Sequence, residues 1–382
     1  MNILKSSLLV ITLPLVVSRL THAASPEITA IRGGRILSMN GPEIQEGVVL
    51  ITDGKITAVG RDVVIPSGAR IIEAKGQWVM PGLVNTHTTV GLAEDRDHES
   101  TDELSDPNTA QLRVLDGLNP FNKEILRLLR SGVTTALLTT GRANVIGAQA
   151  AVIKLWGRTA DEMALRSPAG VKLSFGEGPK SAFGKKGRLP QTRMGNAFII
   201  RKALLDAADY GKKWKDHEAK AKSKGTAPQP PKTDLALEPL ARMLEGRLTA
   251  YIEAYRADDI VTALRLVDEF KLKAVLIGAT EGDLVANEIS RRKIPVIVGS
   301  LGLGAKRTET ERAELELAAR LAKVGLEVAL QTEDSFGIGA AEEFPMVAAL
   351  AVKGGLPRDA ALRSITLTAA EVLGVADRVG SL

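Results

Sequence analysis

The residue best placed for chemistry in this chain is His87, near the end of an apolar run. Val79 to Thr89 has the composition and length of a buried strand, and successive strand side chains point to opposite faces. Residues 87 and 89 therefore face the same way and could grip one metal ion between them. Imidazole is a good ligand for zinc, but position 89 is Thr89, whose neutral hydroxyl is a poor one. The sequence thus supplies one of the two metal ligands that this strand end could provide.

Alternating strands and helices must position His87. This alternation indicates parallel βα units, so we predict an α/β fold, a (β/α)8 TIM barrel with a small N-terminal β-domain. The predicted barrel strands are residues 79–87, 133–140, 150–155, 170–177, 248–254, 273–278, 294–300 and 326–332, of which 150–155 fits least well. The predicted helices are 121–131, 192–208, 235–246, 257–270, 281–291, 308–324, 340–353 and 368–375. The Lys-rich segment 211–233 is predicted to be an insertion or mobile loop.

The N-terminal part of the chain has its own β pattern. Short β-rich runs follow one another between residues 26 and 80, and Asp53-Gly54 between two of them predicts a hairpin. We expect a signal peptide at 1–23, the small β-domain at 24–80 and the barrel at 81–376, with 377–382 beginning a return to the β-domain.

Residues 1–23 have the features of a secretory signal. Lys5 supplies the charge, Leu8 to Val17 the apolar core, and Thr21-His22-Ala23 the small residues before a cut at Ala24. The apolar run is too short to span a bilayer comfortably. The chain has no cysteine, which suits an exported protein. We therefore expect a periplasmic or secreted protein, with no membrane contact after cleavage.

Composition excludes some classes of partner. Of the 382 residues, 45% are hydrophobic and 25% charged, which is ordinary for a globular protein. The net charge of +5 is mild and gathers in the Lys-rich segment, and aromatic residues make up only 3%. We expect no nucleic acid as partner.

Several motifs resemble the amidohydrolase superfamily. Val79 to Thr89 resembles the P-G-L-[IV]-[DN]-x-H-x-H signature that opens its barrels. The resemblance is closest to the exported branch related to imidazolonepropionase, through the motifs Asp116-Gly117-Leu118-Asn119-Pro120-Phe121, Gly132-Val133-Thr134-Thr135, Asn144-Val145-Ile146-Gly147, Val152-Ile153-Lys154-Leu155 and Gly176-Glu177-Gly178-Pro179-Lys180. Thr366 to Val375 resembles the last barrel helix, after which family members return to the small β-domain. This sequence stops where that return would begin, so either it is a fragment or the closing strands are absent.

The resemblance implies a set of metal ligands. An intact family site has two histidines on the first strand, a bridging carboxylate, one histidine on each of two later strands, and an aspartate on the last. His87 matches and Thr89 departs, while Glu177 matches the bridging position. Glu253 and Gly278 stand where the two later histidines are expected.

The strand-eight aspartate is predicted at Asp334, with the adjacent Glu333 as an alternative for this catalytic role. The predicted metal ligands are thus His87, Glu177 and Glu253. Of the remaining histidines, His98 and His217 are interpreted as surface residues.

This ligand set predicts altered chemistry. The family's mechanism forms a bridging hydroxide between two cations, which one imidazole and a few carboxylates cannot hold. We expect at most one divalent ion: zinc by family resemblance, or Mg²⁺ or Mn²⁺ by ligand type. Without a metal, the pKa of at least one crowded carboxyl should rise, unless a nearby base such as Lys154, Lys172 or Arg256 neutralises it.

Two hypotheses about function follow. The first is a hydrolase of non-peptide carbon–nitrogen bonds, of the cyclic amide or amidine type implied by the resemblance, with weak or lost activity. The second is a catalytically silent barrel that binds a small molecule or partners an intact amidohydrolase. Whether the chain forms a homo-oligomer or pairs with an intact paralogue stays open.

Overall fold

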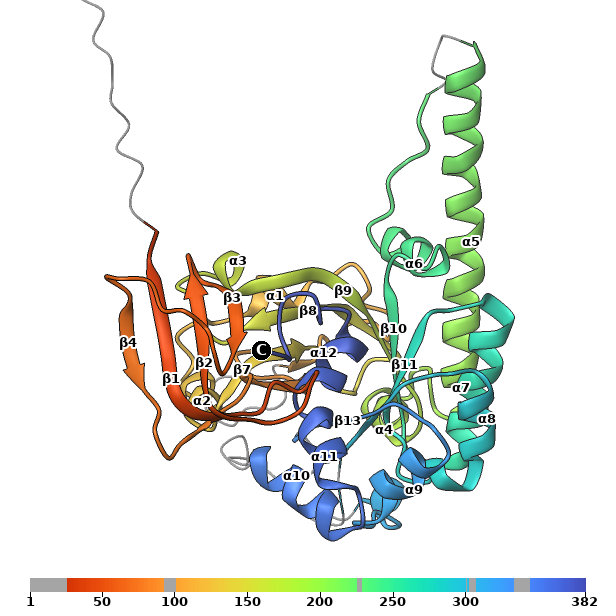
Figure 1. Ribbon diagram of the computed structural model, residues 1–382. Coiled ribbons are helices and arrows are strands. Elements are labelled where there is room, and N and C mark those ends of the chain that lie inside the picture. The colour runs from red at the N-terminus through yellow and green to blue at the C-terminus, as the bar shows by residue number, and fades with distance from the viewer. Residues whose placement is uncertain (1–25, 93–100, 225–228, 300, 302–306, 333–343) are drawn as a thin grey trace, which may run out of the picture. The chain divides into compact units, whose positions relative to one another are not determined.

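The computed structural model describes residues 26–92, 101–224, 229–299, 301, 307–332 and 344–382 (Figure 1). The chain divides into two compact units. The first holds residues up to Ile36 together with Ile44–Trp78, and the second holds Leu37–Glu43 together with Val79–Leu382. No helix in these described ranges is long and apolar enough to cross a membrane.

The first unit is built on a five-stranded sheet. Its strands are β1 (Ile28–Ile36), β2 (Ile44–Thr52), β3 (Lys55–Gly60), β4 (Arg70–Glu73) and β5 (Trp78–Val79), in the order β3-β2-β1-β4 with β5 paired to β1. The predicted hairpin at Asp53-Gly54 is confirmed, because these residues connect the antiparallel strands β2 and β3. Both have positive φ, 49° and 74°, which suits an aspartate followed by a glycine.

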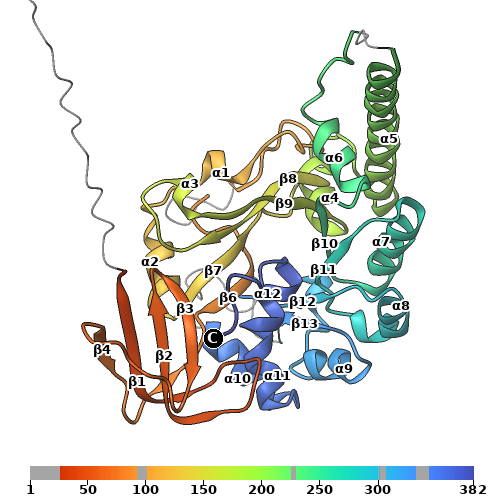
Figure 2. The ribbon, with the colours of Figure 1, turned by 45° about the horizontal axis from the view of Figure 1, so that its top comes forward.

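The second unit contains an eight-stranded sheet, which confirms the barrel prediction (Figure 2). Its strands are β6 (Leu83–Thr88), β7 (Val133–Leu138), β8 (Ile146–Lys154), β9 (Ala164–Ser174), β10 (Thr249–Ala254), β11 (Ala274–Gly278), β12 (Val296–Val298) and β13 (Val328–Leu330), paired in chain order. The first and last strands also meet. The Thr86 hydroxyl donates to the Leu330 carbonyl at 2.8 Å, and the Asn85 amide donates to the Thr332 hydroxyl at 3.1 Å.

One strand departs from the predicted parallel pattern. β8 runs antiparallel to both of its neighbours, β7 and β9. The cause lies in the connections. Residues 139–145 join β7 to β8, and the nine residues between β8 and β9 hold only the short helix α3 (Ala160–Met163). A parallel crossover needs about a dozen residues or more, so these links can only reverse the chain.

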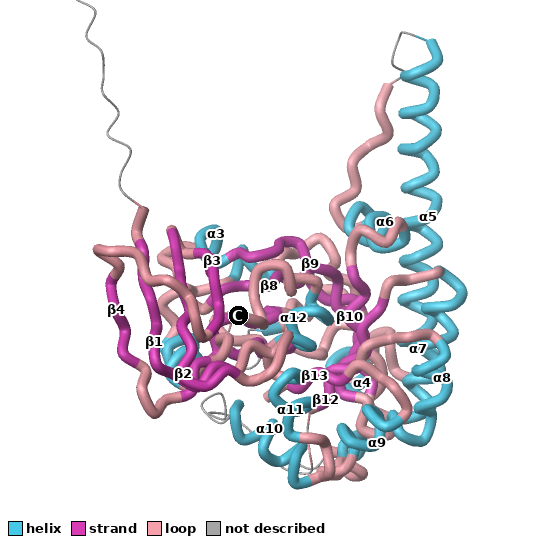
Figure 3. Tube along the Cα trace, viewed as in Figure 1, coloured by secondary structure: helices cyan, strands magenta, loops and turns pink. Residues whose placement is uncertain are grey.

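Helices occupy most of the other connections (Figure 3). The remaining α-helices are α1 (Val114–Gly117), α2 (Lys123–Arg130), α4 (Glu177–Gly184), α5 (Arg193–Lys224), α6 (Leu237–Leu244), α7 (Ala257–Phe270), α8 (Ala286–Arg291), α9 (Leu317–Lys323), α10 (Phe344–Lys353), α11 (Arg358–Ser364) and α12 (Leu367–Leu373), with 3-10 turns η2 (Gly282–Val285) and η3 (Thr308–Thr310). The predicted helix at 257–270 matches α7 residue for residue.

Of the two alternatives predicted for the Lys-rich segment, an insertion or a mobile loop, its first part fits the insertion and is helical. Its first part, 211–224, continues helix α5, which is 32 residues long and extends away from the barrel (Figure 1). Ring contacts stabilise this extension: Tyr210 and Trp214 have centroids 6.3 Å apart, and Trp214 and His217 6.0 Å. Ring side chains about one helical turn apart therefore stabilise the helical conformation of this Lys-rich segment.

The hydrophobic core lies in two layers. The larger cluster fills the space between the barrel strands and the helices around them. A smaller cluster fills the barrel itself, where inward side chains such as Val84, Val152 and Tyr251 meet Ala369 and Leu373 of α12. Burial of each large apolar side chain contributes about 1.5–3 kcal/mol. This inner packing supports the polar residues at the carboxyl ends of the parallel strands.

Candidate functional site

Lys172 lies at the centre of the polar residues inside the barrel. It belongs to β9 and pairs in register with Tyr251 of β10, so Glu253 is its diagonal neighbour on the same face. Its Nζ lies 2.6 Å from Oε2 of Glu253, and the two side chains are only 1% and 3% exposed. A buried ammonium and a buried carboxylate thus compensate each other, which avoids the large cost of burying either alone.

Three groups surround the Lys172 ammonium, one through an ion pair and two through hydrogen bonds. Besides Glu253 it meets the carbonyl oxygen of Thr140 at 2.9 Å and Nε2 of His87 at 3.2 Å. An ammonium group has no lone pair, so His87 Nε2 accepts and the ring proton resides on Nδ1. Nδ1 in turn donates to Oε1 of Gln331 at 2.8 Å. The network fixes the tautomer of His87.

Glu253 is ionised in this network. Burial is the largest single influence and would raise its pKa, but Lys172, His87 and Arg142 together outweigh burial and lower the pKa to about 2. The Tyr255 hydroxyl donates to its other oxygen, Oε1, at 2.7 Å. Of the two outcomes expected for a crowded carboxyl, a raised pKa or neutralisation by a base, Glu253 shows the second.

The other two candidate bases lie elsewhere. Lys154 donates to the Thr135 hydroxyl at 3.2 Å. It stands at the carboxyl end of the antiparallel strand β8, and therefore at the opposite end of the barrel wall from Lys172. Arg256 pairs with Asp258 at 3.0 Å on the surface.

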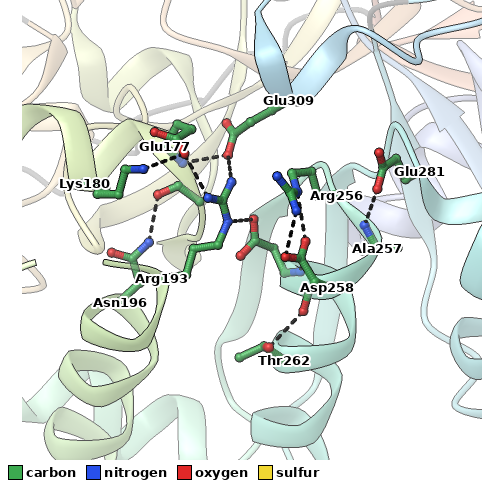
Figure 4. Close-up of polar contacts among 12 residues, drawn as sticks. Glu177, Lys180, Arg193, Asn196, Arg256, Ala257, Asp258, Thr262, Glu281 and Glu309 are labelled. Atoms are coloured by element: carbon green, nitrogen blue, oxygen red, sulfur yellow. Dashed lines mark hydrogen bonds and ion pairs between the residues drawn. The ribbon is translucent and has the colours of Figure 1, made fainter. Parts of the chain in front are cut away.

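Glu177 belongs to a different cluster (Figure 4). β9 ends at Ser174, and Glu177 is the first residue of helix α4, so it is not at the strand end where the sequence suggested it. Its Oε1 accepts from Lys180 at 2.7 Å and from Arg193 at 2.8 Å. These cations lower its pKa, with the Lys180 hydrogen bond as the main cause.

The cluster around Glu177 is organised by Arg193, at the start of α5. The Arg193 guanidinium also contacts Asp259 of α7 at 3.0 Å and Glu309 of η3 at 3.2 Å (Figure 4). The backbone N–H of Glu177 donates to Glu309 at 2.6 Å. Burial raises the pKa of Glu309 to about 6 and raises that of Asp259 as well. This cluster ties together the segments that follow β9, β10 and β12.

Gly278 stands at a position where the family resemblance places a histidine. It has φ of +91°, which disfavours any side chain, and a Cβ there would lie 2.7 Å from Cε1 of Tyr255. The Tyr255 ring therefore fills the space in front of Gly278. Thr89, the other departure, lies just beyond the end of β6, and its carbonyl accepts from the Leu92 N–H in a turn.

The described residues do not assemble the predicted metal site. Among them, no three His, Cys, Asp or Glu side chains lie close enough to hold a metal ion. The lone pair of His87 Nε2 points at Lys172, and the ammonium between His87 and Glu253 repels any cation. A divalent ion could enter only if Lys172 moved. Asp334, Glu333 and His98 lie outside the described residues, and the catalytic role of Asp334 stays a prediction.

Two residues of this region were not singled out by the sequence. Gln331 orients His87 and follows the last strand. Asp102 accepts from the Ala143 N–H and the Thr101 hydroxyl, both at 3.2 Å, and burial raises its pKa while Lys172 opposes the rise. Asp102 is one of several acids between residues 94 and 106, so nothing in the sequence distinguishes it. A lysine inside the apolar run 169–175, by contrast, is a visible signal.

An eight-stranded barrel with its polar residues gathered at strand ends defines the general class, a barrel enzyme scaffold. No family model matches the chain. A solved structure of an amidohydrolase from Thermotoga maritima is 32% identical, with a TM-score of 0.86, and the match covers 92% of this chain and 90% of that one. The chain therefore belongs to the amidohydrolase superfamily.

Curated relatives agree with this assignment. Amidohydrolase tasK of Hapsidospora irregularis is 26% identical over 360 residues, which cover 88% of this chain and 36% of that protein. A 5'-deoxyadenosine deaminase of Methanosarcina mazei is 35% identical over 114 residues, 28% of this chain and 26% of that protein. The chain thus spans about a third or less of the length of these relatives.

Proposed function

We propose that this chain is a hydrolase of non-peptide carbon–nitrogen bonds, of the cyclic amide or amidine type, whose activity is weak or lost. Its membership of the amidohydrolase superfamily supports the reaction class. The observation that carries the proposal of weak activity is the position of Lys172, whose ammonium stands between the imidazole and the carboxylate that the family resemblance assigns to metal. The relation to the exported imidazolonepropionase branch is part of this proposal.

The proposal includes at most one divalent ion, zinc or the harder Mg²⁺ or Mn²⁺. The described part of the barrel supplies one imidazole, in His87, and both of its nitrogens are engaged. A hydrolytic zinc needs three protein ligands. Without a metal, the residues of the network bind and orient: Lys172 offers positive charge, and Tyr255 holds Glu253 in place.

The test compares the buried Lys172 with the half-buried Lys154 on the neighbouring strand. In Lys172→Met, the competing cation is gone, so we expect the affinity for Zn²⁺ or Mn²⁺ to rise at least about tenfold, as removal of a full charge at contact distance implies. In the control Lys154→Met, which lies outside the network, we expect no change. Metal content by elemental analysis and hydrolysis of a cyclic-amide panel are measured for all three proteins.

Two outcomes would overturn the proposal. One is wild-type protein that carries two tightly bound zinc ions and turns over cyclic amides rapidly. The other is loss of bound metal in Lys172→Met alone, which would make Lys172 part of the ligand set.

A second candidate function is a catalytically silent barrel that binds a small molecule or pairs with an intact amidohydrolase. The observation in its favour is the Tyr255 ring in front of Gly278, which closes a position where the family places a ligand. This function predicts ligand binding by metal-free protein without turnover. Turnover that depends on added metal would favour the first function.

We also propose that the protein is exported, with residues 1–23 removed and Ala24 as the mature N-terminus, in the periplasm or outside the cell. The charge and small residues of the N-terminal sequence support this. Intact-mass analysis of exported protein tests it, and retention of Met1 would contradict it.

A further inference from the structure

Helix α5 carries a row of exposed apolar side chains. Met194 is 78% exposed, Phe198 55% and Leu205 53%, and with Arg201 they form the α5 stripe. At about 100° per residue, these four lie within about 60° of one another around the helix axis. On the opposite face, Leu204 is fully buried. Single exposed apolar side chains are common on protein surfaces, but a row of them on one helix face marks an interaction surface.

The spacing of the α5 stripe suits a second copy of the same helix. Its residues are separated by four, three and four positions, so the spacing reads the same from either end. In a two-fold symmetric pair, each residue contacts one whose own counterpart contacts the first in return. Antiparallel α5 helices centred between Phe198 and Arg201 therefore place Met194 opposite the partner's Leu205, and Phe198 opposite the partner's Arg201. A different protein would not need a stripe that is the same in both directions.

Arg201 is the charged member of the α5 stripe, and a second copy accommodates its charge. Glu269 of α7 holds its guanidinium through contacts of 2.9, 3.1 and 2.8 Å. In the antiparallel pair, this guanidinium lies on the partner's Phe198, and Arg is a favoured partner of aromatic rings. Because each Arg201 keeps its own Glu269, the two guanidinium groups near the symmetry axis are both neutralised.

We propose that α5 pairs with α5 of a second copy of this chain in an antiparallel, two-fold symmetric dimer. Residues 194–205 span about 17 Å of helix at 1.5 Å per residue. A contact of this length, with three apolar side chains from each copy, is smaller than a standard interface, so the dimer is weak, with a dissociation constant in the micromolar range. The contact uses no residue of the Lys172 network, so the dimer goes beyond the proposed hydrolase function.

Disulfide cross-linking tests the pairing directly, because the chain has no cysteine of its own. Met194→Cys and Leu205→Cys are prepared as separate full-length proteins. Mixed and oxidised, they should form a cross-linked dimer, since the two positions face each other across the pair. Each protein alone should stay uncross-linked. Equal positions of the two copies are then eleven residues apart along the axis, about 17 Å, and a disulfide bridges Cα atoms no more than about 7 Å apart.

Lys212→Cys is the control for register. Position 212 lies on the same side of α5 but seven residues beyond Leu205, about 10 Å, so its mixture with Met194→Cys should not cross-link.

Sedimentation between about 1 µM and 1 mM protein measures the dimer itself. Wild type should shift from monomer to dimer in this range, and Phe198→Glu should remain monomeric. Leu126→Glu, at a 50% exposed position on α2, is the matched control and should dimerise like wild type.

Four outcomes would overturn the proposal. Cross-linking of Leu205→Cys alone would indicate a parallel pair, and equal cross-linking in the Lys212→Cys mixture would indicate random collision. Wild type that stays monomeric at about 1 mM has no such dimer. A dimer that persists in Phe198→Glu would use another surface. The cysteine variants keep Phe198, so their result does not depend on how well Phe198→Glu folds.

Discussion

The Lys172 ammonium lies where separate segments of the chain bring a carboxylate, an imidazole and a backbone carbonyl together. Each of its contacts, to Glu253, His87 and Thr140, comes from a different part of the chain. The cost of burying this ammonium is offset only while all three contacts exist. The network is therefore cooperative, and removal of one member should weaken the others.

The first prediction concerns the Lys172–Glu253 pair. Glu253→Gln leaves a buried ammonium without its counter-charge, so we expect a loss of about 3–5 kcal/mol in the free energy of unfolding. The double variant Lys172→Met, Glu253→Gln should cost clearly less than the sum of the single changes. Urea unfolding measures all three. As a control, Glu269→Gln, from an exposed pair with Arg201, should cost at most about 1 kcal/mol. Strictly additive losses would show that the two side chains are not coupled.

The second prediction is a pH dependence from Glu309. Its pKa is raised from 4.5 to about 6 in the folded chain, so its contribution to stability is complete below pH 4.5 and is lost as the pH rises through 6. The loss is on the order of 2 kcal/mol. Glu309→Gln cannot ionise, so the stability difference between wild type and this variant should change between pH 4.5 and 7.

Chemical unfolding at several pH values measures that difference, and a constant difference would refute the assignment. Glu253 affects the stability of the fold in a different pH range. Its pKa is lowered to about 2, so its stabilisation is complete above pH 4.5 and disappears as the pH falls toward 2.

At the scale of elements, the apolar runs of the sequence located the barrel strands, because strands buried on both faces read as continuous hydrophobic runs. Their ends agree to within four residues except for the start of β9, which lies six residues before the predicted start at 170. The direction of β8 was not predicted, since a run of apolar residues does not indicate whether a strand is parallel or antiparallel to its neighbours. The lengths of the links on either side of it carry that information. Glu177 was misplaced for a related reason: the sequence does not show that β9 ends at Ser174 and that a helix begins three residues later.

Contacts between residues far apart in the chain could not be predicted from the sequence. Three lysine and arginine candidates were equally plausible as partners of the carboxylates, and only the fold shows that Lys172 faces Glu253 while Lys154 points to the other end of the barrel. Asp102 and Gln331 join the site through segments more than forty residues from Lys172.

The third prediction tests the helical extension of α5. Gly211 lies inside the helix, and a Cβ there would meet Ala241 at 3.6 Å, an ordinary contact. Gly211→Ala should therefore raise the free energy of unfolding by about 0.5–1 kcal/mol. The matched control is Gly246→Ala, where φ is +72° and the space is open, and this change should destabilise. Thermal unfolding by circular dichroism compares them. A loss of stability in Gly211→Ala would mean that 211–224 is not helical in solution.

At the scale of the whole molecule, the chain consists of two compact units of very different size. In the smaller one, β4 is an edge strand whose four residues are all exposed and which pairs only with β1 in the described sheet. In the larger one, every residue of β10 is buried between β9 and β11. The units should therefore differ in their resistance to local opening.

The fourth prediction follows from this contrast. Hydrogen exchange of the backbone amides should be faster in β4 (Arg70–Glu73) than in β10 (Thr249–Ala254) by several orders of magnitude. Mass spectrometry of peptides from the two strands gives the comparison at one pH. Equal protection would indicate that another element covers the β4 edge.

Helix α5 also offers a site at which another helical protein could be fused in a defined orientation. It runs without a break from the Arg193 cluster to Lys224, about 48 Å at 1.5 Å per residue. Each residue added to a straight helix advances a fused helical protein by that same step and rotates it by about 100°. A rigid marker joined in register to this helix would therefore take an orientation set by residue count alone, which would make α5 a handle for imaging the barrel by electron microscopy.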